Sequence, residues 1–316
     1  MGKIVTLGEV VADIYRDKSE SAVEMPFTAR PGGAPANVAV AAARLGAEAA
    51  FISSVGNDLF GDFILRALKA ESVDTGSVVR QEPPTRTSLA FVEIFADGDR
   101  EFTFYRSDPA ADEVLSPEDV RREVVSGASF VNFGSIPLLT EPVRSATRRF
   151  AELAREEDVP VAFDVNFRAR LWESEASARE AVEPLLDLST IVKLSGDETS
   201  PLLGIESFEG AARNLLERGV SLALISLGVE GAFYATKDFE GRLPAFEVEA
   251  VDATGAGDAF LAATLAHLSE TSWEEGSVRE AVRRGTAAGA MACTDYGAMR
   301  PLPTREELES FMENSG

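Results

Sequence analysis

The sequence predicts an α/β protein, with a doubly wound, mostly parallel sheet, helices on both of its faces, and a small β-sheet lid. Two observations support this prediction. Short apolar runs alternate with amphipathic stretches along the whole chain, which is the pattern of repeated strand–helix units. Two segments depart from this alternation, because each holds two strand-like runs with no helix between them, and these segments are expected to form the lid.

The elements of the main sheet are expected in alternating order. Mainly apolar runs predict buried strands at 4–7, 50–54, 130–133, 161–165, 191–194 and 223–226. Apolar residues at helical spacing predict helices at 37–45, 60–70, 142–155, 176–188, 209–218 and 278–292. Because a helix separates most successive strands, the strands are expected to run mostly parallel, with helices covering both faces of the sheet.

The two segments without helices are expected to build the lid. The first holds strand-like runs at 9–15 and 22–27, and the second holds runs at 88–95 and 101–105. Ala-Asp-Gly-Asp-Arg at 96–100 joins the second pair and is suited to a hairpin loop. The lid is therefore expected to comprise about residues 9–30 and 86–108 within a single domain over residues 1–316.

Composition supports a large core and excludes several classes of protein. Hydrophobic residues make up 45% of the 316 residues, enough for a sizeable core. The 30 basic and 53 acidic residues leave a formal net charge of −23, which disfavours binding to nucleic acid or to anionic membranes. The high acidic content and the small number of lysines favour a protein adapted to concentrated salt, and the alternative is an ordinary acidic enzyme.

The small numbers of cysteine and histidine limit the cellular location and the kinds of metal site that the chain can have. Cys293 is the only cysteine, so the chain cannot form an internal disulfide and a reducing, cytoplasmic location is expected. With one cysteine and one histidine, His267, a Cys/His zinc site is excluded. The chain has no apolar run of membrane-spanning length, and its N-terminus is expected to be the first strand and not a signal peptide.

The most informative motif is the run Gly255-Ala256-Gly257-Asp258 at an expected helix start. Small residues let backbone N–H groups gather around an anion, and a helix N-terminus adds partial positive charge. Asp258 could accept the proton of a hydroxyl group that attacks a phosphoryl group. The run therefore indicates phosphoryl transfer to an alcohol, and the alternative is a plain strand–loop–helix turn.

Two further segments hold three candidate ligand contacts. Gly33 lies in a Gly-Gly loop that allows close approach to the backbone, and Asn37 offers a donor and an acceptor to a hydroxylated ligand. Asn37 could instead cap a helix. Arg106 ends the second lid strand, where it could reach a ligand on the main domain or remain a surface arginine of an edge strand.

Polar residues also follow three buried strands, where open α/β sheets bind ligands. Arg168 could contact substrate or phosphate. Glu198, after Lys193, could hold Mg²⁺ through water, or could belong to the acidic first turn of a helix. Ser226, Gly228 and Gly231 form a glycine-bracketed turn suited to a nucleotide.

Several segments together resemble one enzyme family. PGGAPANVAVAAARLG and VDATGAGDAF resemble the two signature regions of the ribokinase-like (PfkB) carbohydrate kinases. EFTFYRSDPAAD, VNFGSIPLLTEP, DVNFRARLW and KLSGDE between them resemble the bacterial and plant fructokinases in particular. The resemblance extends from about Leu7 to about Arg300 and implies a ribokinase-like fold, with ATP beside the GAGD run and sugar between domain and lid.

The resemblance also implies roles for individual residues. Asp258 matches the catalytic base, and the N–H groups of Gly255, Ala256 and Gly257 match the anion hole. The positions that match sugar contacts or substrate-side arginines are Asp13, Gly33, Asn37, Arg106 and Arg168. The positions that match the nucleotide site are Lys193, Ser226, Gly228, Gly231 and Thr286. Mg²⁺ with ATP is implied, together with K⁺, but Ser195 and Ala253 replace the family's usual Asn and Thr near these ions.

These expectations combine into an ATP-dependent kinase that phosphorylates the 6-hydroxyl group of D-fructose. A 2-keto-3-deoxygluconate kinase is the alternative within the family, because it shares the FYR and DVN-x-R segments. From other classes, a nucleotide-dependent oxidoreductase lacks its dinucleotide fingerprint here, and a non-catalytic sugar sensor is disfavoured by the retained Asp258. ATP and a small sugar are the expected partners, and pairing of two lid sheets would give a homodimer.

Overall fold

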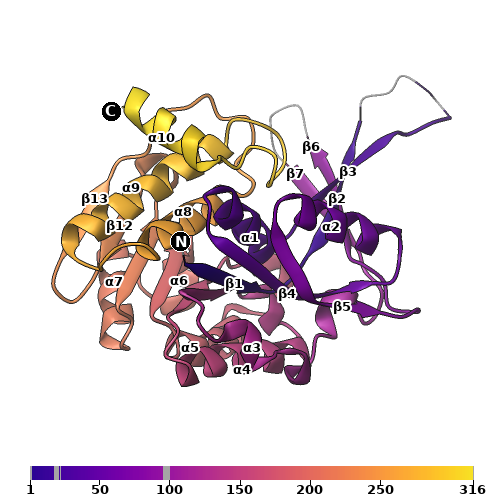
Figure 1. Cartoon of the computed structure of the whole chain (residues 1–316), viewed down its shortest axis with the longest axis horizontal. Coiled ribbons are helices and arrows are strands. Elements are labelled where there is room, and N and C mark those ends of the chain that lie inside the picture. The colour runs from indigo at the N-terminus through magenta and orange to yellow at the C-terminus, as the bar shows by residue number, and fades with distance from the viewer. Residues whose placement is uncertain (1, 18–20, 22, 95–99, 316) are drawn as a thin grey trace.

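A nine-stranded main sheet crosses the middle of the molecule (Figure 1). The computed structural model describes residues 2–17, 21, 23–94 and 100–315. Within these ranges the strands follow the order β13-β12-β11-β10-β9-β8-β1-β4-β5. Their bounds are β1 Lys3–Leu7, β4 Glu48–Gly56, β5 Val73–Gln81, β8 Phe130–Phe133, β9 Val161–Asp164, β10 Ile191–Ser195, β11 Leu222–Ser226, β12 Ala232–Ala235 and β13 Glu240–Leu243. All neighbours from β5 to β11 are parallel, and β12 and β13 pair antiparallel at one edge.

Helices cover both faces of this sheet, as the sequence predicts. On one face lie α1 Ala34–Arg44, α8 Ala256–Leu268 and α9 Glu275–Ala292, with α10 Arg305–Asn314 packed on α9. On the other lie α4 Val143–Glu156, α5 Glu175–Leu186 and α7 Phe208–Glu217. Further helices are α2 Leu59–Ala70, α3 Arg122–Val125 and α6 Gly196–Leu203. No helix in the described ranges is long and apolar enough to cross a lipid bilayer.

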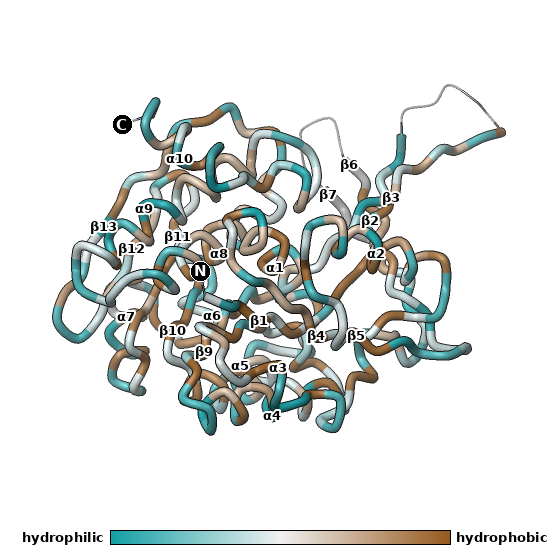
Figure 2. The backbone as a smooth tube through the Cα atoms, in the orientation of Figure 1, coloured by the Kyte–Doolittle hydropathy of each residue, from teal (hydrophilic) through white to brown (hydrophobic). Residues whose placement is uncertain are grey.

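The central strands are apolar because both of their faces are buried. Figure 2 shows hydrophobic segments gathered in the central strands and in α1, with hydrophilic segments along the outer loops. Leu7 of β1, for example, is fully buried and lies opposite Ile52 of β4 and Phe133 of β8. The α/β fold class is therefore confirmed.

Some boundaries differ from those that the sequence predicts. The first helix begins at Ala34 and not at Asn37, because Pro35 is tolerated within a first helical turn. Strand β5 was not expected, since polar residues interrupt its apolar pattern at the edge of the sheet. The short strands β12 and β13 were also missed, and α6 was anticipated only in the alternative interpretation of Glu198.

A separate four-stranded sheet projects from one end of the molecule (Figure 1). Its order is β3-β2-β6-β7, with bounds β2 Val11–Arg16, β3 Phe27–Gly32, β6 Leu89–Ile94 and β7 Arg100–Tyr105. The pairs β2–β3 and β6–β7 are antiparallel, whereas β2 and β6 are parallel. We call these four strands the small sheet.

One strand of the small sheet lies at other residues than the sequence predicts. The strand expected at 22–27 is wrong in position, because β3 begins at Phe27, opposite Arg16, and the apolar Val23 and Met25 are exposed. Backbone pairing with β2, and not the apolar run, sets the position of this strand. The hairpin loop expected at 96–100 falls mostly on residues 95–99, outside the described part of the chain.

Candidate active site

The site is built around the N-terminus of α8. Gly255 precedes the helix in a left-handed conformation, with a φ of 83° that residues with a side chain adopt unfavourably. A helix begins with N–H groups that lack acceptors within the helix and that carry partial positive charge. The sequence places Ala256, Gly257 and Asp258 in this first turn. The helix therefore starts where the sequence predicts, and the anion hole at this helix end stays a prediction.

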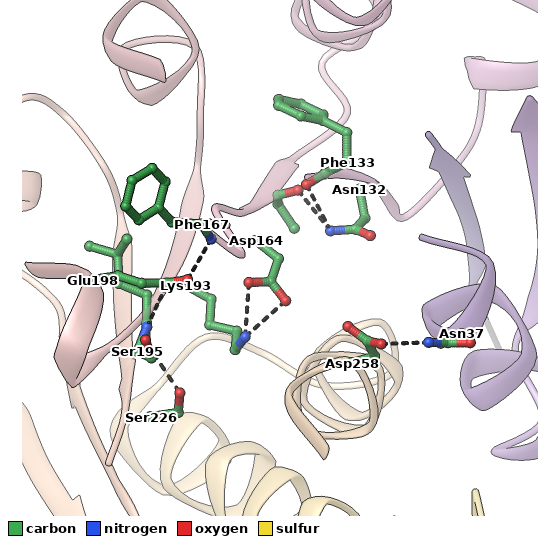
Figure 3. A network of polar contacts seen from close by, with 12 residues as sticks. Asn37, Asn132, Phe133, Asp164, Phe167, Lys193, Ser195, Glu198, Ser226 and Asp258 are labelled. Carbon is green, nitrogen blue, oxygen red and sulfur yellow. Dashed lines mark hydrogen bonds and ion pairs between the residues drawn. The ribbon is translucent and has the colours of Figure 1, made fainter. Parts of the chain in front are cut away.

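Asp258 is the central carboxylate of the site. It is 7% exposed, and its Oδ2 accepts a hydrogen bond from Asn37 Nδ2 of α1 at 2.7 Å (Figure 3). Burial, with the nearby negative charge of Asp164, raises the pKa of Asp258 from 3.8 to about 6, against opposing effects of Asn37, Lys193 and Arg168. Asp258 is thus ionised at neutral pH and more basic than an exposed aspartate, as a general base requires.

A buried ion pair faces the same helix end. Lys193 Nζ of β10 donates to both carboxylate oxygens of Asp164 at 2.8 and 2.9 Å, and the two side chains point toward each other in Figure 3. A Cβ placed on Gly257 would lie 2.8 Å from Lys193 Nζ. Burial disfavours the charged lysine, but Asp164 and Glu198 raise the pKa of Lys193 overall. The ammonium group therefore stays charged in contact with the first turn of α8.

Glu198 links two strand ends beside this pair. Its Oε2 accepts from the Ser195 N–H at 2.7 Å, and its Oε1 accepts from the Phe167 N–H at 2.5 Å. It thereby caps α6, in agreement with the alternative interpretation of an acidic first turn. Burial, with the nearby charge of Asp164, raises the pKa of Glu198 despite the opposing charge of Lys193.

The other residues of the predicted phosphate and nucleotide side lie on neighbouring elements. Arg168 is exposed after β9, and its charge lowers the pKa of Asp258. Ser226 ends β11 directly opposite Ser195 of β10. Gly228 begins the short 3₁₀ helix that follows β11, and Gly231 comes directly after this helix. Thr286 lies on α9, where its hydroxyl donates to the Arg283 carbonyl at 2.8 Å.

The predicted sugar-side residues come from the small sheet and from α1. Asp13 of β2 is buried, and burial together with Asp252 raises its pKa to about 7. Gly33 precedes α1. Arg106, just after β7, lies 3.3 Å from Asp112 through Nη2 and donates to Glu113 through Nη1 at 3.1 Å. Arg106 is therefore a partly buried arginine held by two carboxylates and not a free arginine of an edge strand.

Three acidic residues of the site were not singled out from the sequence: Glu9, Asp112 and Asp164. Asp164 and Glu9 each follow an apolar strand, at its C-terminal end, so their position was a usable signal. Asp112 ends the family-like segment EFTFYRSDPAAD, but only its contact with Arg106 shows that it belongs to the site. Asp258, Asn37, Asp164, Lys193 and Glu198 thus converge from five elements (Figure 3).

Comparison with known proteins covers almost the whole chain. A family profile described as pfkB family carbohydrate kinase matches residues 1–305. Fructokinase-1 of Oryza sativa subsp. japonica is 39% identical over 318 residues, which span 99% of this chain and 98% of that protein.

Solved structures share the architecture. The fructokinase double mutant of Vibrio cholerae O395, with fructose, ADP and potassium bound, superposes with a TM-score of 0.89 at 34% identity and 98% coverage of both chains. Aminoimidazole riboside kinase of Salmonella enterica, complexed with aminoimidazole riboside and an ATP analogue, gives a TM-score of 0.84 at 32% identity. In that comparison 98% of this chain and 99% of the other are covered.

Proposed function

Because this chain belongs to the pfkB family of carbohydrate kinases, we propose that it transfers the γ-phosphoryl group of ATP to the 6-hydroxyl group of D-fructose. Full-length similarity to the rice and Vibrio cholerae fructokinases supports the sugar. The buried Asp258 at the N-terminus of α8 supports the reaction, because it combines a base with an anion-binding helix end. This combination is the observation on which the proposal depends most.

Asp258 is the general base of the proposed reaction. As the 6-hydroxyl oxygen attacks the γ-phosphorus, the hydroxyl proton passes to the carboxylate of Asp258. The bond between the γ-phosphorus and the β–γ bridging oxygen breaks, and ADP leaves with the electron pair of that bond. With a pKa of about 6, Asp258 is available to take the proton at neutral pH.

Positive groups around α8 offset the charge of the transferring phosphoryl group. The N–H groups of Gly255, Ala256 and Gly257 form the proposed anion hole, and the Lys193 ammonium lies against Gly257. Arg168 adds a second cation near Asp258. The nucleotide itself would be held by Lys193, by Ser226 at the end of β11, by Gly228 and Gly231 in the turn that follows it, and by Thr286 of α9.

Magnesium fits the donors at this site through the nucleotide. Within the described ranges no cluster of three or more His, Cys, Asp or Glu side chains could hold a metal by itself. Mg²⁺ characteristically binds few carboxylates and retains phosphate and water ligands. Glu198, whose oxygens each accept one backbone N–H, retains lone pairs for a bound water. Bound there, Mg²⁺ would neutralise phosphate charge, and K⁺ is proposed because the Vibrio cholerae structure contains potassium.

The sugar would lie between the main sheet and the small sheet, which acts as a lid over residues 9–30 and 86–108 of a single domain. Asp13, Gly33, Asn37, Arg106 and Arg168 would contact it. Lid closure would exclude water, which otherwise competes with the sugar hydroxyl as an acceptor.

The small sheet also exposes aromatic side chains that could pack against a second subunit. Phe27, Phe104 and Tyr105 are 43%, 44% and 60% exposed, and Phe27 and Tyr105 each contact the ring of Phe91. Exposed aromatic residues of this kind are typical of interfaces. We therefore propose a homodimer formed through the small sheet, which sedimentation analysis would test.

The cytoplasmic location and the salt-adapted acidic surface remain proposals from composition.

A coupled ADP-release assay against a panel of sugars tests the proposed activity. The panel contains D-fructose, 2-keto-3-deoxygluconate, ribose and aminoimidazole riboside. We expect the highest kcat/KM for fructose. A higher kcat/KM for any other member would overturn the substrate while leaving the family unchanged, and the Asp258→Asn variant provides the background rate.

A further inference from the structure

Glu9 lies where the chain crosses from the main sheet to the small sheet, between β1 and β2. Its backbone is held by neighbours on both sides. Ser53 Oγ donates to the Gly8 carbonyl at 2.7 Å, and a Cβ placed on Gly33 would lie only 2.5 Å from the Glu9 carbonyl oxygen. Glu9 is therefore positioned against the start of α1, the helix that carries Asn37 to Asp258.

The Glu9 side chain is 6% exposed and forms no ion pair with any residue in the described ranges. The charged groups that act on it are Asp112, Asp258 and Arg106. Arg106 is already paired with Asp112 and Glu113, so its charge is balanced without Glu9. Burial, with Asp112 and Asp258, raises the pKa of Glu9 to about 8. Its carboxyl group is thus protonated at neutral pH and can donate a hydrogen bond as well as accept one.

Three buried polar atoms of this region have no hydrogen-bond partner among the described residues: Glu9 Oε2, Asn37 Oδ1 and Arg106 Nε. Such atoms are rare in folded proteins and call for a ligand or an ordered water. Asn37 is bonded to Asp258 through its other side-chain atom, and both Arg106 and Asp258 act on Glu9. The unpartnered Asn37 oxygen therefore belongs to a side chain that contacts the proposed base, and Glu9 lies within electrostatic range of both Asp258 and Arg106.

We propose that Glu9 contacts the substrate and makes the site select an uncharged ketose over a sugar acid. This inference rests on the proposed sugar kinase activity. The Glu9 carboxyl group would donate to one sugar hydroxyl, and Asn37 Oδ1 would accept from another. A sugar acid would bring its carboxylate close to Asp112 and Asp258, while Arg106 is held by its own two carboxylates.

The test compares the full-length protein with its Glu9→Gln and Glu9→Leu variants. Glutamine keeps the size, the donor and the acceptor, so we expect its KM for fructose to stay within about threefold of the wild-type value. Leucine removes both polar atoms, and we expect its KM for fructose to rise on the order of tenfold. The kcat/KM of Glu9→Leu for 2-keto-3-deoxygluconate should stay at the wild-type value. Fructose titration calorimetry gives an independent dissociation constant for each protein.

The pH dependence separates substrate contact from a purely structural role. Above pH 8 the wild-type Glu9 ionises, loses its donor and adds a negative charge beside Asp112 and Asp258. The KM for fructose should therefore rise above about pH 8 in the wild type and stay flat in Glu9→Gln. Glu71→Gln is a matched control, because Glu71 is a partly buried glutamate paired with Arg44 outside the site. It should follow the wild-type pH dependence.

Two results would overturn the role of Glu9. One is a fructose KM that is the same in all three proteins, and the other is an equal loss for fructose and the sugar acid in Glu9→Leu. If Glu9→Leu does not fold, a wild-type KM that does not change above pH 8 overturns it as well. A wild-type preference for the sugar acid overturns both this inference and the proposed substrate. Fructose activity that is insensitive to Glu9 overturns the inference alone.

Discussion

Replacing Asp258 with asparagine should remove catalysis and stabilise the fold at the same time. Asparagine keeps the size of the side chain and still offers an oxygen to Asn37 Nδ2, which donates to Asp258 at 2.7 Å. It cannot take the proton of the sugar hydroxyl. A positioned general base contributes roughly 10²–10⁴-fold to the rate, so kcat should fall by that factor.

The stability change follows from the pKa of the buried carboxyl group. A folded-state pKa raised from 3.8 to about 6 means that the ionised form of Asp258 destabilises the fold by about 3 kcal/mol. This penalty is absent below about pH 4, grows between pH 4 and 6, and is complete above pH 6. At pH 8 the Asp258→Asn variant should therefore melt roughly 4 °C higher than the wild type, and at pH 4 the two should coincide.

Two assays on the same preparations test this reasoning. Coupled ADP release measures kcat, and calorimetric melting at pH 4, 6 and 8 measures stability. Retention of more than about a tenth of the wild-type kcat would show that Asp258 is not the base. A melting temperature at pH 8 equal to or below the wild-type value would refute the assignment of a destabilised, buried carboxylate.

Four further outcomes are expected. The kcat/KM for fructose should fall below about pH 6 as Asp258 becomes protonated, and a pH–rate profile without this limb would contradict the pKa shift. Gly257→Ala should lower kcat/KM for ATP roughly tenfold in steady-state kinetics, because the new Cβ would lie 2.8 Å from Lys193 Nζ and displace the ammonium group. Unchanged ATP kinetics would show that Lys193 does not contact the phosphates of ATP. Lys193→Met should destabilise the fold by about 3–5 kcal/mol in denaturant unfolding by leaving Asp164 unpaired, and adding Asp164→Asn should recover most of the loss. Molar KCl should raise the melting temperature by screening the net charge of −23, and a melting temperature that falls with KCl would remove the salt-adapted interpretation.

The contacts that complete the site join segments far apart in the chain. Asn37 and Asp258 are 221 residues apart, and Asp164 and Lys193 are 29 apart. Asp164 ends a strand, and Asn37 and Asp258 lie near the starts of helices, which are positions that local patterns can identify, whereas Lys193 lies in the middle of β10. The partner of each residue depends on the order of strands in the sheet, and single-sequence periodicity does not contain that order.

The sequence by itself determined the α/β class, the parallel arrangement of the central strands and the GAGD run at a helix start, because apolar periodicity and small residues act locally. Only the tertiary structure decided the position of β3, since pairing with β2 overrode the apolar run that precedes it. The tertiary structure alone also placed Lys193 against Gly257 and buried Glu9 without an ion pair to any described residue. Burial and the sum of neighbouring charges set these properties, and both depend on residues that meet only when the chain folds.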